Sequence, residues 1–519
     1  MDYGFVVSKE TSTVIMVIFA IYSLLICGLG LYTMYASRKL SASDKIANWL
    51  VGGGNLGPFA VCMIGVTNLL SAGAMIGNAG LVYSSGGYIV SVSIITNTYC
   101  VFYLLGTLGK KMAIVRARTG MESVCGILRS RFNSKTLSMV AALIMAFFLT
   151  MNLSSQFMGG AKFFAILSGS NSYYIGMVLI AAVTIIYTAC GGIKSMARIA
   201  VLQGMLMMFS CTFMFIVMYR SLGQKYGSFE QGMYWIATNS DLFMPSKYTF
   251  MQALGTAFSI SLASTVMPYS VVTTLTYKKA STVRRAFILS MIACPFISVV
   301  LTNAAVFTMG INPSLASGDY VTAYIAGVMS PKIIGALVLC GTAAAIQSSC
   351  ASYILIAVTS LVKDMYQGIL KPEVSNEKVS KLMPIWTVII GVIGLIIAFR
   401  PIDLISIINL FSMSGLCCGL FFPLVFGLHS KKVTPKGAVW SAFSGVVTYI
   451  TFFLLQRGAV TGAVYRSLGN IHPIFFGLVV SGLVMYFVSK HTPQVELGVL
   501  QVWFGKTYDP EYAKQLNGK

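Results

Sequence analysis

Long apolar runs follow one another along almost the whole chain. Thirteen of them are close to or above the roughly 20 residues that a helix needs to cross a hydrocarbon core. They lie near residues 12–36, 57–82, 87–108, 136–165, 173–190, 196–219, 250–276, 284–310, 333–362, 383–399, 404–428, 437–456 and 473–489. This pattern predicts an all-α polytopic membrane protein with about thirteen transmembrane helices.

Two of the runs contain small and polar residues where a continuous membrane helix is not expected. The second is interrupted between Thr67 and Asn78, and the seventh carries several hydroxyl side chains before Pro268. Both are predicted to be discontinuous helices. They lie five spans apart, the spacing that two inverted repeats of five helices produce, and matched breaks of this kind indicate a binding site. For either break alone, close helix packing is the alternative explanation.

Composition and charge support a membrane protein and give its predicted orientation. Only 10% of residues are charged, far below the roughly 25% of soluble domains. The formal net charge is +22, which could suggest a nucleic-acid partner, but 27 of the 36 Lys and Arg residues fall in alternate loops and the C-terminal tail. The positive-inside rule then predicts the N-terminus outside, the C-terminus in the cytoplasm and no nucleic-acid partner. We expect the protein in the cell membrane, surrounded by lipid.

The acidic residues indicate which ion can be used. None of the 14 Asp and Glu residues lies in the middle of a span, whereas proton-driven carriers usually need a buried titratable group. Sodium can be held by hydroxyls and by carbonyls freed at a broken helix. Ala345, Ser348 and Ser349 share one helical face in the ninth span, although such serines also often bond to their own helix.

Other chemistry finds little support in the sequence. The 11 cysteines show no CxxC pair, so neither a disulfide framework nor a metal cluster is expected. No Ser/His/Asp set or phosphate loop stands out, so we expect neither an enzyme nor a cofactor. Lys162, near the outer end of the fourth span, is expected to extend its charge to the membrane interface, with anion binding as the alternative.

Two segments resemble a known family. Residues Tyr187 to Lys194, followed by Gln203 and Gly204, resemble the signature of the sodium:solute symporter family, and Ala343 to Ser349 resembles its sodium-site helix. The resemblance covers nearly the whole chain. It implies a LeuT-like core of two inverted repeats. We expect an extra N-terminal helix at 12–36, repeats at 57–219 and 250–428, two C-terminal helices within 437–489 and a cytoplasmic tail at 490–519.

The resemblance also implies a sodium site. Its ligands would be the carbonyls of Thr67, Leu70 and Ala345 and the hydroxyls of Ser348 and Ser349. Substrate would lie beside the broken helices, and its contacts are inferred from location alone. They are Asn68, Ser71, Ala72, Met75, Gln156, Ser261, Ser264, Asn409 and Ser412.

Within the family, four segments are similar to those of the pantothenate carriers. They are residues 108–114, 156–162, 276–280 and 422–428. This similarity implies sodium-coupled import of a small solute, pantothenate or a similar monocarboxylate, by alternating access. A carrier of an amino acid, sugar or polyol with altered or lost sodium coupling remains open, as does a transporter-like membrane sensor.

The sequence departs from the family at two places. Family members usually carry Asp where this chain has Ala200, which puts a second sodium site in doubt. After the seventh-span break many members read Pro-His and, five residues beyond the Pro, an Arg. Here Tyr269 follows Pro268, and Thr273 occupies the Arg position, so substrate recognition and gating are expected to differ.

Overall fold

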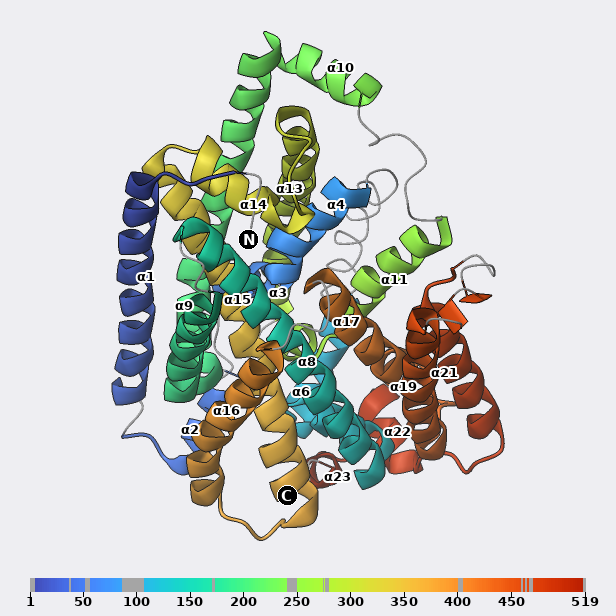
Figure 1. The fold of residues 1–519 in the computed structure, drawn as a ribbon. Helices are drawn as coiled ribbons and strands as arrows, with labels where there is room; N and C mark the ends of the chain where they lie inside the picture. The colour runs from blue at the N-terminus through green and yellow to red at the C-terminus, as the bar shows by residue number, and fades with distance from the viewer. Residues whose placement is uncertain are drawn as a thin grey trace.

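The fold is helical throughout the part of the chain that the structure describes. The computed structural model describes residues 5–36, 39–51, 57–85, 107–169, 173–239, 250–273, 275, 280–399, 405–458, 461–462, 464–465 and 470–516. No β-strand occurs among these residues. Figure 1 shows α1 at one edge of the molecule, the α19 and α21 pair at the opposite edge, and α15 between them.

The helices fall into two lists, before and after residue 240. The first comprises α1 (Lys9–Ala36), α2 (Ala42–Val51), α3 (Pro58–Leu69), η2 (Gly73–Asn78), α4 (Ala79–Ser85), α6 (Gly109–Thr119), α7 (Val124–Phe132), α8 (Lys135–Leu167), α9 (Tyr173–Tyr226) and α10 (Phe229–Asn239). The second comprises α11 (Phe250–Val266), α12 (Pro268–Thr273), α13 (Ala280–Ile311), η4 (Gly318–Tyr320), α14 (Val321–Tyr324), η5 (Ile325–Met329), α15 (Lys332–Val358), η6 (Thr359–Leu370), α16 (Asn376–Ala398), α17 (Ile405–Phe421), η7 (Phe422–Phe426), α18 (Gly427–His429), α19 (Pro435–Arg457), α21 (Pro473–Lys490), α22 (Leu497–Phe504) and α23 (Pro510–Gln515).

Most of the predicted spans are present as single helices. Among the described residues, ten helices are long and apolar enough to cross a membrane. The second and seventh predicted spans are divided, as expected, and each is therefore present as shorter helices. The predicted span at 87–108 lies outside the described residues except for its last two, so the number thirteen stays a prediction.

The two breaks have different local causes. In the second span, α3 ends where Leu70 takes an extended backbone (φ −91°, ψ 116°), and the chain then resumes as the π-helical segment η2. In the seventh span, α12 begins at Pro268 directly after Met267. Proline has no N–H to donate and fits the first turn of a helix, so it favours a new start there.

The fifth and sixth predicted spans meet at a kink within α9. Gly192 has φ 58° and ψ −149°, a backbone conformation that side chains disfavour. A Cβ atom there would also lie 2.7 Å from Cα of Trp49 in α2. Glycine therefore permits both the kink and the close approach of α2.

Helix α15 is the most enclosed long helix of the described structure. It packs against α9, α8 and α1, and nearly every residue from Gly335 to Val358 is buried. Helices α1, α16 and α19 instead expose large apolar side chains such as Leu24, Ile396 and Leu454. Apolar side chains on that scale are what a lipid-facing surface requires. The polar groups of α15 therefore lie in the protein interior, where they can form a site.

Candidate functional site

The break in the second span lies against the middle of α15. The hydroxyl of Ser348 donates to the carbonyl of Thr67 at 3.3 Å, and that of Ser349 donates to the carbonyl of Leu70 at 3.1 Å. Ser348 also lies 3.1 Å from the carbonyl of Ala345 on its own helix. The structure thus brings together all five residues of the predicted sodium site.

This cluster is buried and consists of neutral oxygen atoms. Ser348 and Ser349 are each 1% exposed. Ala200, at the position where family members usually have Asp, is a buried apolar residue of α9. Among the described residues, no group of three or more His, Cys, Asp or Glu side chains could hold a metal ion. Carbonyl and hydroxyl oxygens at a helix break are ligands that membrane carriers use for sodium.

A second polar network joins the break to α8 and α17. The backbone N–H of Ala72 donates to Oε1 of Gln156 at 2.7 Å. Gln156 and Asn409 both donate their amide N–H groups to Oδ1 of Asn152, at 3.3 and 3.1 Å. Three predicted substrate contacts, Ala72, Gln156 and Asn409, therefore belong to one network.

Asn152 is a residue that the sequence analysis missed. It is fully buried, and its own Nδ2 has no hydrogen-bond partner. An unpaired buried donor is costly unless something accepts from it. The available signal was an amide side chain in the middle of an apolar run, one helical turn before Gln156.

The other predicted substrate contacts lie at the breaks but make local contacts. Met75 is fully buried, and the backbone N–H of Met75 donates to the carbonyl of Ser71 at 2.8 Å. Hydroxyls in the seventh and eleventh spans donate to carbonyls four residues earlier on their own helices, the common behaviour of helical serines. These are Ser261, Ser264 and Ser412. The side chain of Asn68 lies outside the described residues.

The two departures after the seventh-span break place a tyrosine next to α15. Tyr269 is 6% exposed, and its ring centroid lies 5.5 Å from that of Tyr353. The hydroxyl of Thr273 donates to the carbonyl of Tyr269 at 2.8 Å. The positions where family members have His and Arg thus hold an aromatic contact and a local hydrogen bond.

Lys162 is held by an ion pair, which corrects the expectation that its charge extends to the membrane interface. Its Nζ lies 3.0 Å from Oδ2 of Asp319 in η4. The lysine side chain is 28% exposed and the aspartate side chain 7%. A buried carboxylate near the lysine provides a closer partner than interfacial water, and sequence could not reveal it because 157 residues separate the two.

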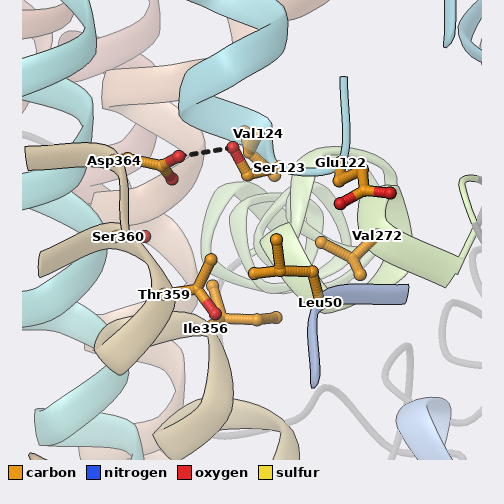
Figure 2. A pocket seen from close by; sticks show the side chains of 9 residues that line it. All are labelled: Leu50, Glu122, Ser123, Val124, Val272, Ile356, Thr359, Ser360 and Asp364. Carbon is orange, nitrogen blue, oxygen red and sulfur yellow. Dashed lines mark hydrogen bonds between the residues drawn. The ribbon is translucent and has the colours of Figure 1, made fainter. Parts of the chain in front are cut away.

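A small cavity lies beside the inner half of the seventh span. It has a volume of about 10 Å³, which is about the space that one water-sized particle needs. Figure 2 shows Val272 of α12, Ile356 of α15 and Asp364 of η6 around it. Oδ1 of Asp364 accepts from the hydroxyl of Ser123 at 2.7 Å, and Ser123 caps the N-terminus of α7. This contact ties η6 to the start of α7.

Comparison with known proteins agrees with this arrangement. The sequence model of the sodium:solute symporter family matches residues 49–445. A sodium/pantothenate symporter of Escherichia coli is 24% identical over 466 residues, covering 88% of this chain and 93% of the relative. A sodium/proline symporter of Staphylococcus aureus is 25% identical over 501 residues, covering 94% of each.

A solved structure supports the fold. The substrate-bound, outward-open state of a Na+-coupled sialic acid symporter superimposes with a TM-score of 0.73 at 16% sequence identity. The match covers 95% of this chain and 99% of that one. At this identity the likeness shows the LeuT-like fold and leaves the solute to be argued from the site.

Proposed function

Because the chain belongs to the sodium:solute symporter family, we propose that it imports a small organic solute together with sodium by alternating access. Pantothenate or a similar monocarboxylate is the preferred solute. The chain is a polytopic membrane protein with ten long apolar helices among its described residues. We assign it no catalytic residue and no cofactor other than the coupling sodium ion.

One observation carries the proposal: the hydroxyls of Ser348 and Ser349 lie against the carbonyls of Thr67 and Leu70, at 3.3 and 3.1 Å. A sodium ion among these atoms would bind the same oxygens, together with the carbonyl of Ala345. The hydroxyls would then turn their lone pairs toward the ion. No group has to gain or lose a proton, which suits an ion that carries its own charge.

The solute would bind beside this site, on the network of Ala72, Asn152, Gln156 and Asn409. Its amide groups offer donors and acceptors in a buried setting. The remaining proposed contacts stand on their position at the breaks. They are Asn68, Ser71, Met75, Ser261, Ser264 and Ser412.

The named relatives support a carboxylate-bearing solute. Pantothenate and proline both carry a carboxylate, and their symporters have similar identity to this chain. The two pantothenate relatives, at 24% and 26% identity, favour pantothenate. A carrier of an amino acid, sugar or polyol is the alternative. In that alternative the replacement of the family aspartate by Ala200 would weaken or remove sodium coupling.

Alternating access follows from two halves that move around the shared site. We assign the halves to residues 57–219 and 250–428, with the N-terminus outside and the tail from residue 490 in the cytoplasm. One sodium charge falling through 100 mV provides about 2.3 kcal/mol. The membrane potential therefore drives uptake in addition to the sodium gradient.

Uptake into proteoliposomes tests the proposal. Labelled pantothenate should accumulate with an inward sodium gradient, and Ser348→Ala with Ser349→Ala should lower apparent sodium affinity at least about tenfold, since hydrogen-bonding or ligating a charge is worth roughly 1.5–3 kcal/mol. Ser441→Ala is the matched control, because this buried serine pairs with Ser481 in the α19–α21 pair, away from the site. Equal uptake with potassium replacing sodium would contradict sodium coupling. Binding of solute without any flux would favour the sensor.

A further inference from the structure

The ion pair between α8 and η4 points to a charge-selecting residue. We propose that Lys162 receives the carboxylate of an incoming anionic solute, and that Asp319 takes the place of that carboxylate while the outer route is closed. The inference rests on the proposed function and names the group that recognises the solute's charge.

The geometry of the pair makes Lys162 depend on an anionic partner. Its Nζ is 3.0 Å from Oδ2 of Asp319, whose side chain is only 7% exposed. Breaking a largely buried pair leaves an uncompensated charge, which is strongly destabilising. If Asp319 moves away, another anion at Lys162 lowers the free energy of the resulting state.

Lys162 stands on the helix that carries the solute network. It follows Gln156 by six residues of α8, which is about 9 Å of helix rise. Gln156 in turn accepts the backbone N–H of Ala72 at the break. A solute approaching that network along α8 therefore passes Lys162 before it reaches the amide groups.

The segment that carries Asp319 covers the second half of the broken second span. Gly318 lies so close to the carbonyl of Gly80 that it has no room for a side chain. The hydroxyl of Thr322 donates to the carbonyl of Met75 at 2.6 Å. The segment from Gly318 to Met329 thus lies over η2 and α4, and the ion pair fastens it to α8.

This segment lies on the same face of the molecule as the N-terminus. The ring centroid of Phe5 is 5.2 Å from that of Tyr324. In the proposed orientation this is the outer face, from which solute is taken up. Lifting the segment would remove Asp319 and open the way to Lys162 in one movement.

The consequence is competition between two carboxylates for one ammonium group. An anionic solute can replace Asp319 at Lys162, so it stabilises the open state by a differential interaction. A neutral analogue of the same shape cannot. Preference for the anion should therefore depend on the charge of Lys162 and increase when Asp319 loses its own charge.

A matched pair of competitors tests this directly. Inhibition of sodium-driven uptake is measured with pantothenate and with pantothenol, in which an alcohol replaces the carboxylate, and in parallel with proline and prolinamide. The wild type should prefer the acid of the pair it accepts. Lys162→Met should reduce that preference at least about tenfold. Lys162→Arg should retain it, and Asp319→Asn should retain or increase it.

The controls separate charge selection from folding and from sodium coupling. Lys332→Met removes an exposed lysine that pairs with Glu10, and it should leave the preference unchanged. An unchanged preference in Lys162→Met, or a lost one in Asp319→Asn, would show that the pair is only structural and overturn the inference. Equal inhibition by acid and alcohol in the wild type would also overturn it, while sodium-dependent uptake would still stand. Sodium-independent uptake with an intact Lys162 effect would instead count against the proposed symport alone.

Discussion

At the scale of single residues, Asn152 offers a direct test of the solute network. Its Oδ1 accepts from both Gln156 and Asn409, at 3.3 and 3.1 Å, and its Nδ2 is a buried donor without a partner. Asn152→Ala removes the shared acceptor and the free donor together. We expect the half-saturating solute concentration to rise about tenfold, since each lost buried partner costs roughly 1–3 kcal/mol. Uptake at saturating sodium measures this change.

The sodium dependence of the same variant distinguishes the two sites. The hydroxyl and carbonyl cluster does not include Asn152, so half-saturation by sodium should stay near the wild-type value. Asn303→Ala is a suitable control, because that side chain donates only to the carbonyl of Val299 in its own helix, at 2.8 Å. A changed sodium dependence with unchanged solute affinity would contradict the assignment of Asn152.

Residue positions could be predicted only where a motif or a local break marks them. The set around Ser348 and Ser349 came from a family resemblance, and the structure brings those residues together. Nothing local links Lys162 to Asp319, since 157 residues of chain separate them. For the same reason Asn152 was overlooked, although it stands only four residues before Gln156.

At the scale of elements, the N-terminal helix α1 is tied to the sodium-site helix through one hydroxyl. Tyr22 donates to Oε1 of Gln347 at 3.0 Å and accepts from Nε2 of Gln203 at 3.1 Å. All three residues are buried. Tyr22→Phe leaves both amide groups unpaired, so we expect a loss of about 1–3 kcal/mol of stability. Thermal unfolding in detergent measures it.

The exposed Tyr32 on the same helix provides the comparison. It is 62% exposed and contacts the Arg198 guanidinium through its ring, which Tyr32→Phe would preserve. Its melting temperature should match that of the wild type. If Tyr22→Phe also melts at the wild-type temperature, the hydroxyl does not hold α1 against the core.

Elements were predictable from the sequence where apolar length and breaks identify them. The two discontinuous helices appear where Thr67 to Asn78 and Pro268 predicted them. The short helices α2, α7 and α10 were not predicted, because their apolar stretches are too brief to stand out between spans. The predicted separation of the fifth and sixth spans is a kink at Gly192, which depends on a tertiary contact with Trp49.

At the scale of the whole molecule, the C-terminal pair α19 and α21 is attached to the core partly through α11. His472 stands at this joint: it caps α21, and its Nδ1 accepts from the backbone N–H of Ile474 at 3.3 Å. It packs against Gly255 of α11 so closely that a side chain at Gly255 would collide with it. Burial lowers the pKa of His472 from 6.5 to about 4.

The sign of this shift predicts an acid-sensitive joint. Between pH 6.5 and 4 the unfolded chain binds a proton at His472 and the folded chain does not, so stability is full above pH 6.5 and falls as the pH drops toward 4. At 1.36 kcal/mol for each pH unit, the loss between pH 7 and pH 5 is about 2 kcal/mol. Melting curves of the purified protein should show it. His472→Gln should flatten this dependence, whereas His491→Gln, at an exposed position, should leave it intact. A profile that His472→Gln does not alter would place the acid sensitivity elsewhere and leave the α11 joint indifferent to pH.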